Sequence, residues 1–218
     1  MDIAALIKEK GVKTHPVVKF DDYLVLDLSK DNRALQTMDL NNEHSFSSFI
    51  FNQLKANNNE VGIGGYGEER ALYSRSNLFE GEEARTVHLG IDIWSKAGTP
   101  VYCPLDGIVH SFANRAVHGD YGPVIILTHQ VQGFIFHSLY GHLSTASLEG
   151  LEVGKAFRAG QQLATMGQYK ENFHWPPHLH FQLIVDMEEY NGDYPGVCKR
   201  SEREQFLVNC PDPSVFIC

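Results

Sequence analysis

The sequence lacks several features that would assign it to a common class. No apolar run approaches the roughly 20 residues that span a bilayer, so no membrane-spanning segment is expected. The opening stretch, MDIAALIKEKGVKTHPVV, lacks a basic start followed by a long apolar segment, which predicts a cytoplasmic protein without a secretory signal. No basic stripe offsets the formal charge of −9, so nucleic acid and anionic lipid are not expected partners.

Cysteine pairs of the C-x-x-C kind are also absent, which argues against a zinc finger or a thioredoxin-type site. Cys198 and Cys210 could close a short loop as a disulfide. Free thiols in a reducing compartment are the favoured interpretation, because no secretory signal is visible. The sequence holds four cysteines, Cys103, Cys198, Cys210 and Cys218.

What is present divides the chain into an extension, residues 1–60, and a main domain, residues 61–218. In the extension we expect a short helix over Asp2–Glu9 and an amphipathic helix from about Ser45 to Lys55. No chemistry is visible in this segment, and the simplest prediction is that it packs against the main domain. The second helix is predicted from the spacing of four apolar residues, Phe46, Phe49, Ile50 and Leu54.

From residue 61 onward, glycine recurs every few residues and short β-rich runs alternate with turns. This pattern predicts an all-β domain. Two stretches, AGTPVYCPLDGIVHSF and EVGKAFRAGQQLATMG, place glycines and β-rich segments at comparable spacing. The similarity favours a sandwich built from a duplicated β-hairpin motif.

Two histidines lie in the run WPPHLHFQLIV, whose composition predicts a strand. Alternation on a strand points His178 and His180 to the same face, about 6 to 7 Å apart. This separation suits one metal ligand and one neighbour that reaches a metal-bound water, whereas two ligands on one metal would be more strained. Because Pro176 and Pro177 cannot continue a central strand, we expect the pair at a strand's beginning, near a sheet edge or rim. Alone, the pair also fits two surface histidines.

A second pair, His88 and Asp92, lies in the run TVHLGIDIW. On a straight strand the two would be about 13 Å apart, too far to bind one ion with zinc–ligand distances near 2 Å. A bend or bulge at Gly90 would bring them together. The alternative is a histidine at the edge of the core and an aspartate in a turn.

The third cluster is His142 in LYGHLS. A histidine opposite a metal can hydrogen-bond the attacking water or a developing oxyanion. No glutamate has H-E-x-x-H spacing, so histidine would have to transfer the proton in any hydrolysis. His174, close to the WPPHLH run, is the least secure of the histidines that we interpret as structural or exposed. These are His15, His44, His110, His118, His129, His137 and His174.

Taken together, the order H-x-x-x-D, G-T-P-V, Y-G-H-L-S and H-L-H-F resembles the lysostaphin-type (LytM-like) zinc metalloendopeptidases over residues 61–190. The A-G-T-P-V run at residues 97–101, the D-G-x-V turn at residues 106–109 and Gly167 also match. Members of this family cleave peptide cross-bridges or stem peptides of bacterial peptidoglycan. The resemblance implies a duplicated hybrid motif (barrel-sandwich hybrid), a β-sandwich with a groove across one sheet.

By motif position, the resemblance implies one Zn²⁺ ion bound by His88, Asp92 and His180. His142 and His178 would then orient and deprotonate the water and stabilise the tetrahedral intermediate. Zinc lowers the pKa of its bound water to about 7 and polarises the scissile carbonyl. A further hypothesis is that residues 1–60 cover the groove, with an asparagine or histidine filling the open zinc position as in latent members of the family.

Two alternatives to a peptidase acting on peptidoglycan remain. One is a zinc hydrolase of a cytosolic small peptide or metabolite that uses the same site. The other is a non-catalytic binding module on a related fold. Lipoyl and biotinyl carriers need a lysine at a hairpin tip, which is not evident here, and a histidine phosphocarrier has no need of Asp92.

Overall fold

The computed structural model describes residues 3–39, 42–70, 84–115, 120–172 and 175–217. Strands dominate from residue 61 onward, and the predicted all-β class is confirmed. Within the described residues, no helix is long and apolar enough to cross a membrane. The strands are β1 (Leu24–Leu26), β2 (Gly62–Gly64), β3 (Arg85–His88), β4 (Ile91–Trp94), β5 (Pro100–Tyr102), β6 (Gly107–Arg115), β7 (Gly122–Val131), β8 (Phe134–Gly141), β9 (Ala156–Phe157), β10 (Gln162–Thr165), β11 (His178–Ile184) and β12 (Val197–Lys199).

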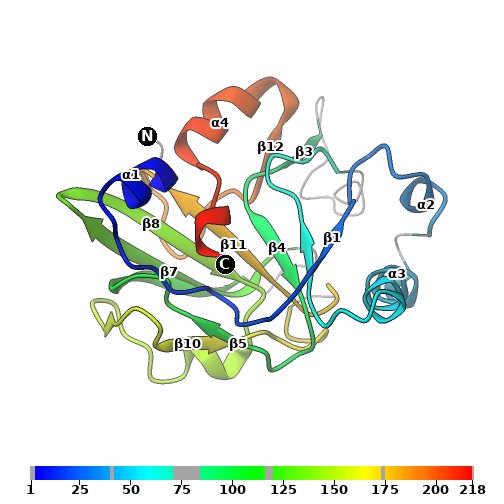
Figure 1. The fold of residues 1–218 in the computed structure, drawn as a ribbon, viewed down its shortest axis with the longest axis horizontal. Helices are drawn as coiled ribbons and strands as arrows, with labels where there is room; N and C mark the ends of the chain where they lie inside the picture. The colour runs from blue at the N-terminus through cyan, green and yellow to red at the C-terminus, as the bar shows by residue number, and fades with distance from the viewer. Residues whose placement is uncertain (1–2, 40–41, 71–83, 116–119, 173–174, 218) are drawn as a thin grey trace.

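Eight strands form one sheet in the order β1-β2-β4-β11-β8-β7-β6-β9 (Figure 1). Two further pairs, β10 with β5 and β12 with β3, form separate two-stranded sheets. The two similar stretches seen in the sequence pair with each other, because β5 and β6 of the first bind β10 and β9 of the second. This mutual pairing of the two stretches places the largest apolar cluster between the large sheet and the β5–β10 pair. The cluster includes Val101, Leu127, Leu163 and Phe181.

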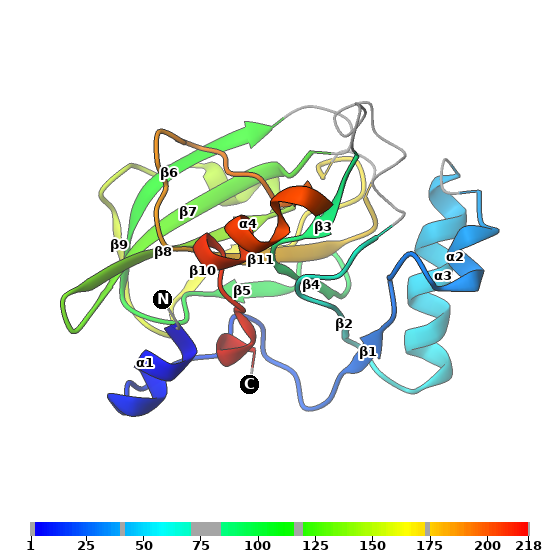
Figure 2. The same ribbon diagram turned by 90° about the horizontal axis from the view of Figure 1, so that it is seen from above.

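The N-terminal segment contacts the main fold at two separate places along the molecule's long axis (Figures 1 and 2). Helix α1 (Ile3–Glu9) lies toward one end and buries Ile3 and Ile7 in the largest apolar cluster. Farther along the segment, β1 pairs in parallel with β2 and thereby adds a strand to the large sheet. The predicted packing against the main domain is therefore seen, although the boundary at residue 60 stays a prediction.

Helices α2 (Arg33–Gln36) and α3 (Glu43–Ala56) follow β1. Helix α3 confirms the amphipathic helix expected over Ser45–Lys55. It buries Phe46, Ile50 and Leu54 in a second apolar cluster that also contains Trp94 and Trp175. Near the C-terminus, α4 (Arg203–Asn209) follows β12, and the short 3₁₀ helices are Thr145–Leu148, Arg200–Glu202 and Ser214–Phe216.

The described cysteines, Cys103, Cys198 and Cys210, are all buried and free. The expectation of free thiols is confirmed for these three, and Cys218 lies outside the described residues. Burial raises the pKa of the Cys198 thiol to about 11. The thiol is therefore protonated at neutral pH.

Candidate metal centre

The register between β4 and β11 places the site residues opposite one another. Asp92 faces His180 across the two strands, and Trp94 faces His178. Since residues two apart on a strand share a face, the four side chains lie on one side of the sheet. The predicted start of a strand at His178 is confirmed. Of the expected edge or rim position, the edge is wrong, because β11 lies between β4 and β8. The two prolines do precede the first paired residue, so the pair lies where the strand begins.

His88 reaches this face through a bend. Strand β3 ends at His88 and β4 begins at Ile91, and between them the chain passes from the small sheet into the large one. His88 Nε2 consequently lies 3.2 Å from Asp92 Oδ1, which confirms the expected bend. Gly90 is required there, because a Cβ atom would lie 2.6 Å from the carbonyl oxygen of Phe181.

The three predicted metal ligands, His88, Asp92 and His180, converge and are called the metal group below. One donor atom from each of His88, Asp92 and His180 lies within 4.8 Å of the others, and all three residues are buried. His88 Nε2 is 2.9 Å from His180 Nδ1, which is 3.2 Å from Asp92 Oδ1. Ligands around a tetrahedral zinc ion with bonds near 2.0–2.1 Å are separated by about 3.3 Å, so this set fits one ion closely.

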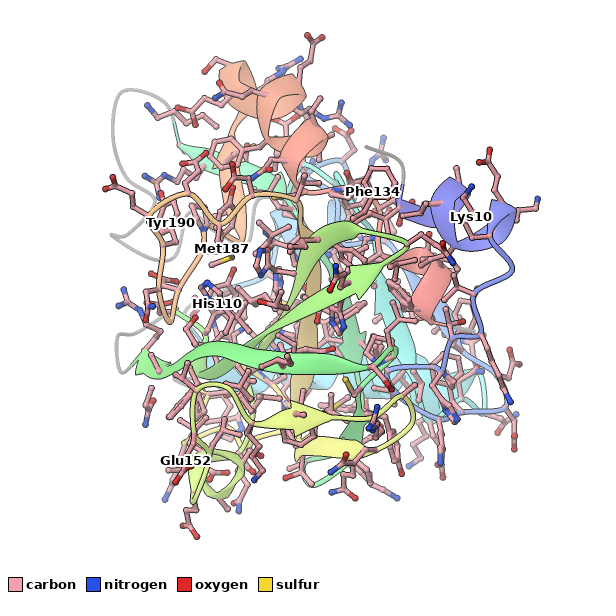
Figure 3. All side chains as sticks on the ribbon, turned by 90° about the vertical axis from the view of Figure 1, so that its left-hand side faces the viewer. Lys10, His110, Phe134, Glu152, Met187 and Tyr190 are labelled. Carbon is pink, nitrogen blue, oxygen red and sulfur yellow. The ribbon has the colours of Figure 1, made fainter. Side chains whose placement is uncertain are left out.

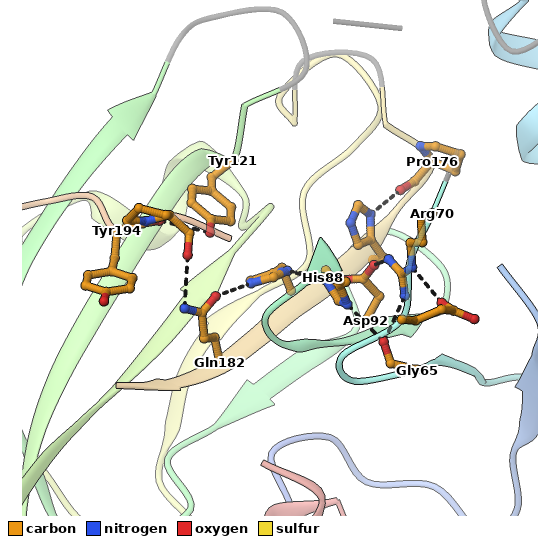
Figure 4. A network of polar contacts seen from close by, with 12 residues as sticks. Gly65, Arg70, His88, Asp92, Tyr121, Pro176, Gln182 and Tyr194 are labelled. Carbon is orange, nitrogen blue, oxygen red and sulfur yellow. Dashed lines mark hydrogen bonds and ion pairs between the residues drawn. The ribbon is translucent and has the colours of Figure 1, made fainter. Parts of the chain in front are cut away.

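Hydrogen bonds on the outer sides of the two rings fix which nitrogens face inward (Figure 4). His88 Nδ1 donates to the carbonyl oxygen of Gly65 at 3.0 Å. His180 Nε2 donates to Gln182 Oε1 at 2.9 Å, and the Gln182 amide is oriented by its own bond to the Pro195 carbonyl. The inward nitrogens of both rings then carry lone pairs. Two lone pairs 2.9 Å apart beside a carboxylate favour a cation between them, and a metal ion fits this position.

A buried arginine completes the group and was missed from the sequence. Arg70 is 1% exposed, and its Nη1 donates to Asp92 Oδ2, which leaves Oδ1 for the metal group. Its Nε donates to Glu68 Oε2 at 2.7 Å. The stretch YGEER that contains Arg70 offers no spacing to the three clusters. Only the bonding of Arg70 across the fold shows that it belongs to the site.

The second pair of predicted residues lies beside the metal group. The rings of His142 and His178 are 3.9 Å apart between centroids. His178 Nδ1 donates to the carbonyl oxygen of Pro176 at 2.7 Å, so Nε2 is the nitrogen with the lone pair. His142 Nδ1 is buried and makes no hydrogen bond to a described residue. His142 also has a φ of 60°, an uncommon conformation for a residue with a side chain and one that is enriched at functional sites.

Burial keeps the imidazoles of His88, His142 and His178 neutral. It lowers the pKa of His178 to about 4 and, with the nearby Arg70 charge, lowers that of His88 to about 4. Burial also lowers the pKa of His142 well below its usual value. Burial alone would raise the pKa of Asp92, but His88 and the Arg70 guanidinium lower it well below the usual range. A carboxylate among neutral imidazoles is the protonation state in which these residues bind a metal.

A pocket of about 240 Å³ opens over Asp92, His142, His178 and His180. None of residues 3–39 and 42–60 lines it, so no described residue of the segment supports the hypothesis that residues 1–60 cover the groove. Asn42, a polar candidate from the segment, instead caps α3 by accepting hydrogen bonds from the backbone of His44 and Ser45. The remaining lining residues are Arg70, Arg85, Trp94, Arg115, Asp120, Tyr121, Trp175, Tyr190, Asp193, Tyr194, Pro195, Gly196 and Val197.

The other described histidines do not join the metal group. His110 (Figure 3) lies with its ring 5.1 Å from that of His137, and His137 is 3.1 Å from the Thr128 hydroxyl. His129 lies 2.6 Å from the Ser138 hydroxyl. These contacts agree with a structural interpretation. His118 and His174 lie outside the described residues.

A buried His-Asp-His group under a pocket, with two more histidines beside it, is typical of metal-dependent hydrolases. Comparison with known proteins gives the family. Residues 86–192 match peptidase family M23, and this part of the chain belongs to that family. The resemblance drawn from the sequence is thereby confirmed for residues 86–192. No curated protein matches the chain.

Three solved structures illustrate the likeness. A zinc-containing peptidase from Vibrio cholerae is 26% identical over 50% of this chain and 32% of its own, with a TM-score of 0.39. Csd3 from Helicobacter pylori is 26% identical over 57% of this chain and 32% of its own, with a TM-score of 0.37. The catalytic domain of lysostaphin from Staphylococcus simulans is 22% identical over 69% of this chain and 93% of its own, with a TM-score of 0.42. The aligned part thus spans about a third of each of the first two proteins.

Proposed function

We propose that the protein is a zinc-dependent endopeptidase that hydrolyses peptide bonds in peptidoglycan cross-bridges or stem peptides. The observation that carries this proposal is the convergence of three donor atoms, from His88, Asp92 and His180, beside the His142–His178 pair in one pocket. Membership of a peptidase family supports the reaction class. The peptidoglycan substrate follows from the family resemblance.

His88, Asp92 and His180 would hold the ion. When bound, zinc polarises the scissile carbonyl and lowers the pKa of a water molecule. Arg70 keeps Asp92 ionised and occupies its outer oxygen. Gly65 and Gln182 hold the outer protons of the two ligand imidazoles, so that their inner nitrogens stay available.

His178 takes up the proton from the attacking water at Nε2, because its Nδ1 proton is already donated to Pro176. The same Nε2 then returns the proton to the leaving amine. His142 lies against His178 and hydrogen-bonds the developing oxyanion. No glutamate base is needed, which agrees with the missing H-E-x-x-H motif.

The test begins with zinc content and peptide cleavage of the purified protein. We expect about one zinc per chain and an activity that a chelator removes and zinc restores. His180→Ala should lose both zinc and turnover, whereas His142→Ala should keep zinc and lose at least about 100-fold in kcat. His110→Ala, outside the site, is the control and should retain both.

Substrate choice is tested separately. Muropeptides are compared with glycine-rich peptides, peptides that contain D-alanine and ordinary L-peptides. Preference for muropeptides supports the peptidoglycan assignment. Cleavage of L-peptides alone would favour a hydrolase of other small peptides. A wild-type protein that binds no zinc when it is supplied in excess would contradict the proposal.

A further inference from the structure

The ring of His178 is held between two aromatic neighbours. Trp94 stacks on it with centroids 4.0 Å apart and planes 19° apart, and His142 lies on it at 3.9 Å. Among the described residues, the ring of His178 makes one hydrogen bond, from Nδ1 to the Pro176 carbonyl oxygen. The ring contacts therefore decide where Nε2 points. The position of Nε2 therefore depends on where the Trp94 indole lies.

Packing holds that indole. Trp94 is 1% exposed, and its Nε1–H makes no hydrogen bond to a described residue. The edge-to-face partner of the indole is Phe46 of α3, with centroids 5.5 Å apart and planes 89° apart. Phe46 is fully buried. Because no polar bond fixes Trp94, loss of the Phe46 ring would leave space into which the indole can move.

Phe46 also contacts the second indole beside the histidines. Its ring centroid is 6.3 Å from that of Trp175, which lies 6.2 Å from His178 and 6.3 Å from His142. A single side chain of the N-terminal segment thus packs against both tryptophans next to the proposed proton-transfer pair. Neither Phe46 nor any other described residue of α3 lines the pocket.

We infer that α3 is part of the catalytic apparatus, with Phe46 acting as a positioning residue that fixes His178 through Trp94. The inference rests on the proposed function, since His178 moves the proton there. It assigns to residues 43–56 a supporting role behind the site, in place of a covering role over it. Displacement of a catalytic group by about 1 Å can lower a rate about 100-fold, so a buried ring outside the pocket can control turnover.

The test compares Phe46→Ala and Phe46→Leu with the wild type, all loaded with zinc. We expect Phe46→Ala to keep one zinc and an unchanged KM but to lose about 10- to 100-fold in kcat. Phe46→Leu, which fills most of the space, should recover part of the loss and serves alone if Phe46→Ala does not fold. Leu35→Ala is the matched control, because Leu35 is buried in the same apolar cluster on α2 without an aromatic ring. It should retain wild-type kcat.

A second readout does not need activity. Stacking on Trp94 should shift the NMR signals of the His178 ring protons upfield in the wild type. This shift should diminish in Phe46→Ala and Phe46→Leu and persist in Leu35→Ala.

Three outcomes would overturn the inference: wild-type kcat in the Phe46 variants, zinc loss that accounts for the lower rate, or an equal loss of kcat in Leu35→Ala. A wild type that cleaves none of the substrates would instead refute the proposed function, while the NMR shift still decides whether Phe46 positions His178.

Discussion

At the scale of single residues, the metal group depends on protons that lie on its outer side. Gln182 accepts the Nε2 proton of His180 and is itself oriented by Pro195. If that acceptor is lost, His180 can place its proton on the inward Nδ1 and can no longer donate a lone pair to a metal. Such partners typically contribute 10- to 100-fold to metal affinity.

We therefore expect Gln182→Leu to lower zinc affinity by about 10- to 100-fold with the fold preserved. Competition with a chelator of known affinity measures the change. Gln130→Leu, on an exposed position of β7, is the control for the same chemical replacement and should bind zinc as the wild type does. Wild-type affinity in Gln182→Leu would show that His180 does not need this bond.

Much of the site could be predicted at this scale, because histidine and aspartate spacing is visible in a sequence. The sequence suggested His88, Asp92, His142, His178 and His180 as site residues, and the structure brings all five together. Arg70 could not be found in this way. Its role comes from a contact across 22 positions with Asp92, and a lone arginine in a polar stretch carries no such signal.

At the scale of elements, the turn between β3 and β4 decides whether the ligands meet. The chain changes sheets at residues 89–90, and His88 folds back toward Asp92 only because Gly90 has no side chain. An added methyl group would also approach His180 Nε2 to 2.8 Å. A side chain at position 90 would therefore meet both the backbone of β11 and the proposed metal ligand His180.

Gly90→Ala should consequently destabilise the fold by about 1–3 kcal/mol and weaken zinc binding, because backbone must shift to admit the methyl group. Chemical unfolding and zinc titration measure the two effects. The matched control is Gly65→Ala, whose methyl group would meet only Glu68 at an ordinary 3.6 Å. Normal zinc affinity in Gly90→Ala would mean that the turn adapts without moving His88 or His180.

Elements in which apolar residues recur at a regular spacing were predictable, and very short elements were not. Helix α3 followed from four apolar residues at helical spacing, and the observed bounds differ by one or two residues. Strand β1 is three residues long, which gives no alternation to detect, and its parallel partner β2 lies 38 positions later. Of the edge or rim position expected for the His178–His180 pair, the edge was wrong, because the prolines mark the end of strand β11 and not the side of the sheet.

At the scale of the whole molecule, buried neutral histidines make stability depend on pH. His129 is buried between the Asp106 carbonyl and the Ser138 hydroxyl, and burial lowers its pKa to about 4. In the unfolded chain its pKa is about 6.5. Below pH 6.5 the unfolded state binds the proton first. The free energy of unfolding therefore decreases as the pH is lowered, until about pH 4.

From these pKa values we expect His129 to contribute about 2 kcal/mol to the loss of stability between pH 7 and pH 5. Urea unfolding of the metal-free protein at both pH values gives the total change. His129→Gln removes the titrating group, and the difference between the two proteins isolates its share. An identical pH dependence in both would show that His129 is already protonated in the folded state at pH 5.

The architecture of the main domain was predictable because its two similar stretches and its turns are visible in the sequence. How the first 60 residues join it was not, since the link consists of the apolar face of α1, a three-residue strand and a set of aromatic contacts. Phe46, Trp94 and Trp175 are distant in the chain, and only their packing shows that they adjoin the histidines.

The parallel β1–β2 pair limits where a shortened version of the protein can be cut. A fragment restricted to residues 86–192 would omit β1, β2 and β12, together with Arg70 and the Gly65 carbonyl. Strand β4 would then be an open edge with the Trp94 indole bare beside it, a surface prone to self-association. A working fragment must begin ahead of Leu24 and extend beyond Lys199.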